Sequence, residues 1–556
     1  MSGENRLATQ SEAMRSRVTN RMFRGVCVIV LLFAAVPRVY HFSQRSLWLD
    51  EALAANISRG TLPETLTLTR AFHSAPMFHP LLLWGVEKVS TGPLAVRMPS
   101  VIASLLAVLL MLFFAKIPTV GWQTATLSAL MLGVSAVQIR YAQEVREYSL
   151  SVLYAGVLLY CFLLYAAKRD ELGSPIPLYF ALFVAPFVQY GLVLFSGGVL
   201  SALFVLALVD GKRRQRLSHL VVASAALGVG GFLSFLLTLR YQWGDVAWYL
   251  DDYYYTRGSS VLRFVLSNTH HLITYFLPGL AAASVSVVAV LLHLGGSIRA
   301  RKLQPLTVLA FTSVGVVLAC ALLHLYPYGA IRQCLFLTPV LSLFASACLV
   351  EVANRMPERA RVATYGAIVC IVVISGALQF RLVKPYAEIE DMQHVLFELR
   401  SHIEPTDRVY VYPGAVPAVD FYMRDRDPRY TFGDFHQQAP QEYVPEMLLG
   451  AGPGTDRLWI VFSHVYRDED QRILGDLSGQ WNVKPDLSVK GSALYLADRR
   501  IPVPTAALDL NNLAIESKAT HSPSRLEDSF WKWNIRNCSR PFCRALQADA
   551  AGSGKQ

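Results

Sequence analysis

Repeated apolar runs, most of them long enough to cross a lipid bilayer, limit the fold of this 556-residue chain more than any other feature. A membrane-spanning helix needs about 17–25 predominantly apolar residues. Irregular chain is excluded from the hydrocarbon layer because its backbone polar groups would find no partners there. The sequence therefore predicts a polytopic α-helical membrane protein with about eleven transmembrane helices. The predicted spans are 26–39, 99–114, 122–139, 150–167, 178–195, 197–209, 220–239, 272–294, 305–325, 334–350 and 362–378.

Composition excludes two broad classes of protein. Hydrophobic residues make up 53% of the chain and charged residues only 16%, whereas soluble domains average about 25% charged residues. An ordinary cytosolic enzyme and a disordered chain are both excluded. The net charge of +11 does not indicate a nucleic-acid partner, because the basic residues sit in short clusters between apolar runs. Membrane lipids are the expected surroundings.

The basic clusters also predict the topology. They fall at 168–169, 212–216, 299–302 and 355–361, in alternate loops, as expected of loops on the cytoplasmic side. Residues 1–24 are then a cytoplasmic N-terminal segment, and 25–381 form the transmembrane domain, with a long external loop at 41–97. The loops at 141–148, 241–271 and 326–332 share that external face. Within the first loop, 77–89 is too short for a confident span and is predicted to be an interfacial helix.

Residues 382–500 are predicted to form a separate extracytoplasmic domain. Helical spacing at 392–403, 442–449 and 468–477 alternates with strand-like segments at 408–412, 458–462 and 493–496. Helices that alternate with short strands predict a small α/β domain. Residues 501–556 form a polar tail, which we expect to be flexible.

Charged residues on the external face are the candidates for chemistry. Asp50 and Glu51 follow the first span closely, so either can be a general base held at the bilayer surface; solvated loop charges are the alternative. Glu144 and Arg146 add a carboxylate and a guanidinium on the same face, although a surface ion pair is the simpler interpretation.

Arginines and histidines on the external face suggest that this face binds an anion. Arg97 and Arg332 are outward-facing cations that run against the usual charge bias, and guanidinium binds phosphate bidentately. His73 and His79 flank Pro76, although two loop histidines are more often incidental than ligands. The sequence has neither a glycine-rich phosphate loop nor a zinc motif. The spans also lack the buried charges of a transport pathway, which counts against a pump.

Taken in order, five motifs on this face resemble the GT-C membrane glycosyltransferases related to dolichyl-phosphate-mannose protein mannosyltransferases and the bacterial aminoarabinose transferases. The resemblance covers about residues 22–380. Each motif is weak alone, and their order makes the set fairly specific. The motifs are Trp48-Leu-Asp-Glu51, Pro76-Met-Phe-His-Pro-Leu-Leu-Leu-Trp84, Ala95-Val-Arg-Met-Pro-Ser100, Tyr141-Ala-Gln-Glu-Val-Arg-Glu-Tyr-Ser-Leu150, and Arg332 ahead of Leu337-Thr-Pro339.

The resemblance implies an inverting hexosyl or pentosyl transferase with an undecaprenyl- or dolichyl-phosphate sugar donor. Asp50 maps to the catalytic acid of the family, with Glu51 beside it. Arg97, Arg146 and Arg332 are then the cations that stabilise the leaving phosphate. Glu144 would orient the acceptor or help to hold a divalent cation. A divalent cation is the one cofactor that the resemblance leaves open.

The chain departs from the family pattern at one place. Relatives carry a His or Lys before a Pro–Pro pair where this chain has Ser74-Ala75-Pro76-Met77, so His73 or His79 is the expected substitute as a phosphate ligand. Two alternatives stay open: a polysaccharide polymerase or ligase, and a transporter or non-catalytic subunit of a cell-envelope assembly complex. The sugar, the acceptor (glycan, lipid or protein), metal dependence and the oligomeric state are not written in the sequence.

Overall fold

A computed structural model describes residues 23–42, 44–166, 174–209, 213–242, 252–300, 304–423, 427–434 and 442–499. The chain divides into two compact units. The helical unit comprises 1–42, 74–82 and 97–386, and the α/β unit comprises 43–73, 83–96 and 387–556. The predicted polar tail and nearly all of the predicted cytoplasmic N-terminal segment lie outside the described residues.

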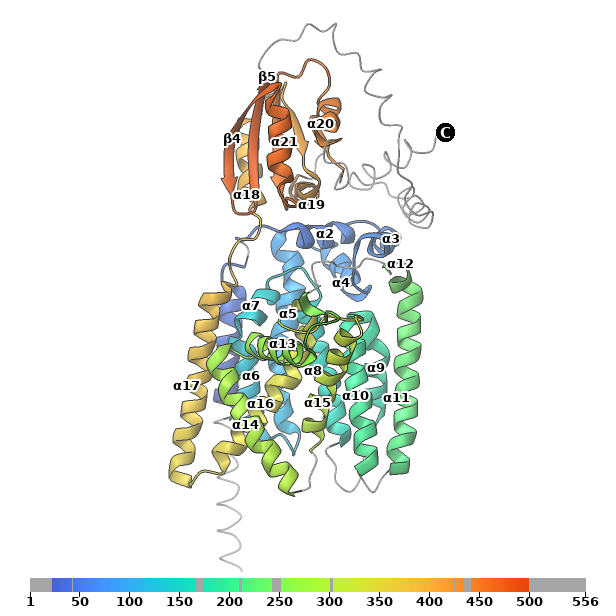
Figure 1. Cartoon of the computed structure of the whole chain (residues 1–556), viewed down its shortest axis with the longest axis vertical. Helices are drawn as coiled ribbons and strands as arrows, with labels where there is room; N and C mark the ends of the chain where they lie inside the picture. Colours follow the sequence, from blue (N-terminus) through green and yellow to red (C-terminus); the bar gives the residue numbers. More distant parts are fainter. Residues whose placement is uncertain are drawn as a thin grey trace, which may run out of the picture. The chain divides into compact units, whose positions relative to one another are not determined.

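Long apolar helices dominate the helical unit (Figure 1). Among the described residues, 8 helical runs are long and apolar enough to cross a membrane. They are α5 (Pro93–Phe113) with η1 (Phe114–Lys116), α8 (Tyr148–Ala166), α10 (Gly191–Val209), α11 (Arg213–Ser234) continuing through η2 (Phe235–Leu239) and α12 (Arg240–Gln242), α14 (Gly279–Ala300), α15 (Pro305–Leu322), η4 (Arg332–Leu337) with α16 (Thr338–Asn354), and α17 (Glu358–Val383). These helices confirm a multi-pass membrane protein.

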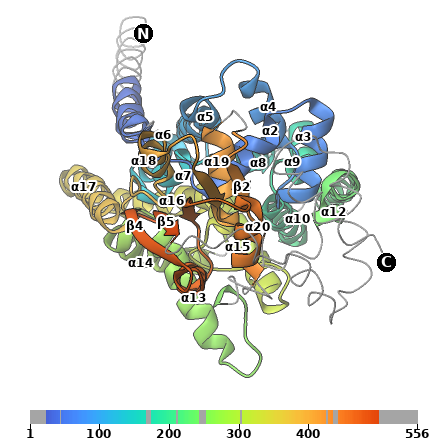
Figure 2. The ribbon, with the colours of Figure 1, turned by 90° about the horizontal axis from the view of Figure 1, so that it is seen from above.

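The helices pack in two groups of three. Helices α14, α16 and α17 contact one another on one side of the unit, and α9 (Ile176–Val188), α10 and α11 do so on the other. Figure 2 shows α14, α16 and α17 from above, and α9 and α10 apart from them. Helices α8 and α15 connect them, since α8 contacts α9 and α16, and α15 contacts α10 and α16.

One predicted span, 122–139, is broken at Ser135 into α6 (Gly121–Val134) and α7 (Ala136–Ala142). Two buried side chains stabilise the break. The fully buried Arg38 donates to the carbonyl oxygens of Leu132 and Gly133 at 3.0 and 2.7 Å, which satisfies the end of α6. Gln379 accepts from the backbone N–H of Ala136 at 3.0 Å, which satisfies the start of α7. Without these two side chains, the carbonyl oxygens at the end of α6 and the N–H group at the start of α7 would lack hydrogen-bond partners.

Two other predicted spans have different boundaries in the structure. The predicted pair 178–195 and 197–209 is wrong at its junction, because the chain turns at Gln189 and Tyr190, between α9 and α10. The predicted span 272–294 is divided at Leu277 and Pro278 into α13 (Val261–Phe276) and α14. Figure 1 shows α13 running across the direction of the long helices.

A five-stranded mixed sheet forms the centre of the α/β unit, in the order β2-β1-β3-β5-β4. Strand β1 pairs in parallel with β2 and β3, and β5 pairs antiparallel with β3 and β4. The sequence patterns miss β2 and β4, because β2 has three residues and β4 buries only Trp481 completely. The strands are β1 (Arg408–Val411), β2 (Tyr430–Phe432), β3 (Arg457–Ser463), β4 (Trp481–Val489) and β5 (Ser492–Arg499).

Helices cover both faces of this sheet. Helices α20 (Tyr443–Ala451) and α21 (Glu469–Ser478) share a core with Leu458, Ile460 and Phe462 on one face of β3. Side chains alternate along a strand, so Trp459 and Val461 face the opposite layer, where α18 (Met392–His402) contacts β3, β4 and β5. The small α/β domain expected after the transmembrane region is confirmed.

Part of the first loop belongs to this unit. Its helices are α2 (Leu49–Ser58) and α3 (Leu62–Phe72), and α4 (Phe78–Glu87) follows at the predicted interfacial segment. The backbone N–H groups of Ser46 and Leu47 donate to Glu388 and to the Tyr422 hydroxyl, both at 2.7 Å. The prediction grouped 41–97 with the transmembrane domain, whereas these contacts group most of that loop with the α/β domain.

Candidate active site

In the helical unit, two of the predicted phosphate-binding arginines approach one aromatic ring. The guanidinium carbon of Arg146 lies 5.7 Å from the centre of the Tyr148 ring, and that of Arg332 lies 5.6 Å from it. Arg146 reaches this position from the turn between α7 and α8, and Arg332 is the first residue of η4. Residues distant in sequence are therefore brought together around Tyr148, at the start of α8.

The turn that carries Arg146 is held by its neighbours in the fold. Nε2 of Gln143 donates to the carbonyl oxygens of Arg38 and Tyr40 at 3.0 and 2.8 Å. The hydroxyl of Ser100 donates to the carbonyl oxygen of Arg146 at 3.1 Å. These hydrogen bonds fix the backbone of the turn that carries Arg146.

Carboxylates balance part of this positive charge. Glu147 lies 3.5 Å from Arg146, and both side chains are nearly buried. Glu144, a predicted site residue, is 1% exposed and lies 3.3 Å from Arg140, one helical turn before it. Within the helical unit, Glu144 is therefore a buried, arginine-paired carboxylate, contrary to the surface-pair interpretation.

The remaining predicted residues of the helical unit are Arg97 and His79. Arg97 is 1% exposed and donates to the carbonyl oxygen of Phe42 at 3.2 Å. Burial lowers the pKa of His79 to about 4, while Glu147 raises that pKa and Arg146 lowers it. His79 is therefore neutral at physiological pH, so it can offer an anion a hydrogen bond but no charge.

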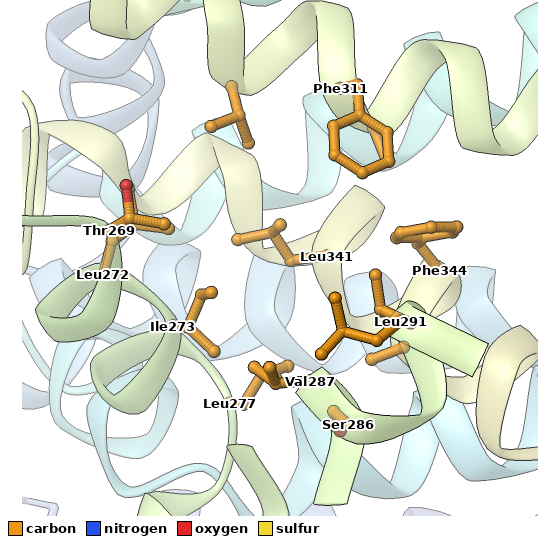
Figure 3. A pocket seen from close by; sticks show the side chains of 14 residues that line it. Thr269, Leu272, Ile273, Leu277, Ser286, Val287, Leu291, Phe311, Leu341 and Phe344 are labelled. Carbon is orange, nitrogen blue, oxygen red and sulfur yellow. The ribbon is translucent and has the colours of Figure 1, made fainter. Parts of the chain in front are cut away.

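An apolar cavity of about 210 Å³ lies between α13, α14, α15 and α16 (Figure 3). Polar atoms are nearly absent from its wall, to which Thr269 and Ser286 contribute the hydroxyl groups. Thr269 also shares a hydrogen bond of 2.8 Å with the hydroxyl of Tyr328, in the loop that leads to Arg332. Figure 3 shows Leu341 and Phe344 of α16 on the same wall. The cavity is therefore lined almost entirely by apolar side chains.

In the α/β unit, Asp50 and Glu51 occupy the first turn of α2. Acidic side chains there interact favourably with the positive end of the helix dipole. Glu51 is fully buried and lies 3.8 Å from the guanidinium of Arg45, which favours a structural role. Asp50 keeps part of its surface exposed, so it is the carboxylate of the two that a substrate can reach. His73 ends α3 and is buried.

Two residues that the sequence patterns did not indicate stand beside α2. Glu390 is 3% exposed, accepts the backbone N–H of Leu49 at 2.8 Å, and pairs with Nδ1 of His464 at 2.6 Å. The hydrogen bond to Glu390 raises the pKa of His464, burial opposes it, and the charges of Glu390 and Asp50 raise it further. One signal was available in the sequence: His464 directly follows the buried strand β3.

A divalent cation also has candidate ligands inside the α/β unit. Glu398, His402 and Asp486 place one ligand atom each within 4.8 Å of the others. They lie at the surface, and His402 already pairs with Glu398 at 3.1 Å. This group lies on α18 and β4, so it does not include the predicted catalytic carboxylates.

Comparisons with known proteins identify the fold. No family profile matches the sequence, and no curated protein is similar to it in sequence. Among solved structures, ArnT from Cupriavidus metallidurans in the apo state has a TM-score of 0.54 at 15% identity, covering 87% of this chain and 98% of that chain. The same protein bound to undecaprenyl phosphate has a TM-score of 0.52 at 14% identity, covering 85% and 97%.

A second solved protein has a similar fold, with a lower TM-score and a lower sequence identity. AglB, the oligosaccharyltransferase of Archaeoglobus fulgidus, was solved with an inhibitory peptide and a dolichol-phosphate. It has a TM-score of 0.50 at 12% identity, covering 87% of this chain and 75% of that chain. The chain therefore has the fold of ArnT and AglB, which confirms the predicted GT-C-like fold class.

Proposed function

We propose that this protein is an inverting glycosyltransferase that moves one sugar from a polyprenyl-phosphate carrier to an acceptor on the extracytoplasmic face of the membrane. The observation that carries the proposal is the approach of Arg146 and Arg332 to the Tyr148 ring. The GT-C fold supports it, and ArnT, of similar fold, was solved with undecaprenyl phosphate bound.

In this reaction the leaving group is a lipid phosphate, and its negative charge would be stabilised by two neighbouring guanidinium groups. When the bond between the anomeric carbon and the phosphate oxygen breaks, its electron pair stays on the lipid phosphate. Arginines placed in advance stabilise that charge without reorganising during the reaction. In this proposal Arg146 and Arg332 bind the phosphate, Arg97 supports it from its buried position, and His79 adds a hydrogen bond.

Asp50 is the proposed general base. It takes the proton of the acceptor hydroxyl as that oxygen attacks the anomeric carbon from the face opposite the phosphate, which inverts the configuration. The products are the glycosylated acceptor and the free lipid phosphate. Partial exposure of Asp50 and burial of Glu51 support this division of roles. Glu144 would orient the acceptor.

The apolar cavity suits the tail of the carrier. Its wall of leucine, valine and phenylalanine side chains offers an isoprenoid the environment of the lipid interior. The chain continues from Arg332 through η4 into α16, whose Leu341 lines the cavity. A single short segment therefore carries both a proposed phosphate ligand and part of the proposed tail site.

A transfer assay on the full chain in nanodiscs tests the proposal. The donors are a panel of polyprenyl-phosphate sugars, with polyprenyl-diphosphate glycans included to detect a polymerase or ligase. We expect the wild type to release lipid phosphate and the Asp50→Asn variant to lose that activity while keeping its thermal stability. Asp468→Asn, at an exposed position ahead of α21, is the matched control. Equal turnover by the wild type and Asp50→Asn would remove Asp50 as the base.

A further inference from the structure

The apolar cavity of the helical unit ends at a pair of aromatic rings. Phe311 of α15 and Phe344 of α16 both line it, and their ring centres lie 5.9 Å apart in an edge-to-face arrangement. Such pairs are favourable contacts. Figure 3 shows the two rings on the side of the cavity opposite Thr269 and Leu272 of α13. The two rings therefore form an end wall of the cavity, away from α13.

A hydrogen-bonded histidine lies behind this end wall. The ring of His293, on α14, meets the Phe344 ring edge to face, with centres 5.8 Å apart. His293 is buried, and both of its ring nitrogens have partners: Nδ1 pairs with Glu351 at 2.5 Å and Nε2 with the Thr307 hydroxyl at 3.0 Å. An apolar chain that passed this layer would break those hydrogen bonds, and buried polar groups without partners are costly. The cavity therefore ends at the level of Phe344.

Between α14 and α15 the cavity is open to the outside of the helical unit. Three of its lining residues keep much of their surface exposed: Val287 at 40%, Leu291 at 63% and Phe311 at 51%. On the opposite wall, Phe344 and Ala345 of α16 are buried. Both α14 and α15 are long and apolar enough to cross a membrane, so their exposed apolar side chains face lipid. The cavity therefore opens sideways into the membrane.

The cavity is short compared with a polyprenyl chain. Its lining on α14 runs from Ser286 to Leu291, which is a rise of about 8 Å at 1.5 Å per residue. An extended isoprene unit, with four chain bonds, is slightly longer than the roughly 3.5 Å of an extended residue, which has three. Since an apolar cavity of about 150 Å³ holds the six carbons of benzene, about 210 Å³ holds roughly eight carbons at the same packing. Both estimates correspond to about two isoprene units.

A short stretch of backbone separates the proposed phosphate ligand Arg332 from the cavity. Helix η4 and the start of α16 connect Arg332 to Leu341, which lines the cavity. At about 2.0 Å per residue in η4 and 1.5 Å in α16, this stretch rises by about 16 Å. An isoprenoid that follows it uses about three units before it reaches the cavity. The carrier therefore meets the end wall at about its fifth unit.

We propose that this protein binds only about the first five isoprene units of its carrier, and that the rest of the chain leaves between α14 and α15 into the membrane. This inference rests on the proposed function, because it places the tail of the same lipid phosphate. Phe344, supported by His293, ends the bound part of the chain. The site therefore requires a minimum length of carrier and does not distinguish longer carriers from one another.

Photo-crosslinking of the full chain in nanodiscs locates the carrier without requiring turnover. Two undecaprenyl phosphates carry a diazirine, one at the fifth isoprene unit and one at the terminal unit, and mass spectrometry identifies the labelled residues. We expect the fifth-unit probe to label the cavity, in competition with unlabelled undecaprenyl phosphate, and the terminal probe to label phospholipid. Terminal-probe labelling of Leu349 or Val350, buried in α16 beyond the wall, overturns the inference. A cavity left unlabelled by the fifth-unit probe also overturns it.

Removal of the end wall gives a second test with the same probes. In Phe344→Ala, we expect the label from the fifth-unit probe to extend to His293 and Thr307, which lie behind the wall. Phe397→Ala is the matched control, because Phe397 is an exposed phenylalanine on α18. Its labelling pattern should coincide with that of the wild type. An unchanged pattern in Phe344→Ala removes Phe344 as the end of the bound chain.

The length of the carrier gives a third test, by turnover. Sugar donors built on geranyl, hexaprenyl and undecaprenyl phosphate are compared at equal mole fraction in the nanodisc, so that partitioning into the membrane does not enter. We expect kcat/KM of the two long donors to agree within about twofold. The geranyl donor should be lower by about tenfold or more, because it ends before the cavity and loses its packing contacts.

The outcomes separate this inference from the proposed function. Cavity labelling by the fifth-unit probe in a protein that transfers no sugar supports the tail site and overturns the proposed transferase. A kcat/KM that keeps rising from the hexaprenyl to the undecaprenyl donor overturns the inference and leaves the transferase standing. Cavity labelling, a terminal unit in lipid and equal rates for the two long donors support both.

Discussion

The pair of arginines at Tyr148 allows a quantitative prediction for lipid-phosphate binding. Arg146 and Arg332 each lie within 6 Å of one ring centre, so their charges are no more than about 11 Å apart. At that separation and an effective dielectric constant near 20, the two charges repel by about 1.5 kcal/mol. A phosphate bound to both relieves this repulsion and gains charge-assisted hydrogen bonds worth about 1.5–3 kcal/mol each.

We therefore expect Arg332→Gln and Arg146→Gln each to weaken binding of undecaprenyl phosphate by about 10- to 100-fold, since 1.4 kcal/mol corresponds to a factor of ten. The double variant should depart from the sum of the two losses, because both side chains serve one ligand. Arg332→Lys should lose less than Arg332→Gln, since it keeps the charge but not the planar fork.

Native mass spectrometry of the full chain in detergent, titrated with the lipid phosphate, measures these affinities. The unphosphorylated polyprenol is the ligand control, and its affinity should not change. Arg359→Gln removes the same charge at an exposed position at the start of α17. If neither arginine variant weakens binding more than Arg359→Gln does, the reasoning about Tyr148 is refuted.

Three further predictions concern stability, the cavity and pH. Gln379→Leu should lower the thermal unfolding temperature in detergent, because it leaves the N–H of Ala136 and three carbonyl oxygens without this hydrogen-bond partner. A buried polar group without a partner costs about 1–3 kcal/mol of stability. An unchanged unfolding temperature would contradict this prediction. Leu341→Trp, which fills the cavity, should weaken binding of long polyprenyl phosphates more than that of a short prenyl phosphate, and equal losses would exclude a tail there. Because the pKa of His464 is raised on folding, its pair with Glu390 contributes stability that is complete below about pH 6.5 and is lost as the pH rises through the raised pKa. Thermal unfolding at several pH values should show this loss in the wild type and not in Glu390→Gln.

The membrane spans could be predicted where hydropathy alone decides them. Helices α8, α15 and α17 begin and end within a few residues of the predicted runs, or extend them. The breaks between α6 and α7 and between α13 and α14 could not be predicted in the same way. They depend on Arg38 and on Gln379, which bind backbone groups far away in the sequence, including the carbonyl oxygen of Leu277 at 3.0 Å.

The candidate site was predictable only in part, for a similar reason. Asp50 is recognisable from its position after the first span, and Arg146 from its motif. The approach of Arg332 to Tyr148 leaves no local signal, because it depends on the packing of distant segments. For His464 the local signal is only its place directly after a buried strand, and its approach to α2 depends on packing in the same way. Glu390 resembles any loop carboxylate until its burial and its hydrogen bonds are known.

The α/β unit gives α2 a fixed position that a loop at a water surface would not have. Backbone N–H groups in such a loop usually bond to water, and each ordered residue loses about 1–2 kcal/mol of conformational entropy. Here the N–H groups of Ser46, Leu47 and Leu49 are all bonded to side chains of the C-terminal region. At the other end of α2, Asn56 donates to the carbonyl oxygen of Pro417 at 2.8 Å. With both ends bound to one scaffold, Asp50 on the first turn has little freedom left, which is the preorganisation that a general base requires.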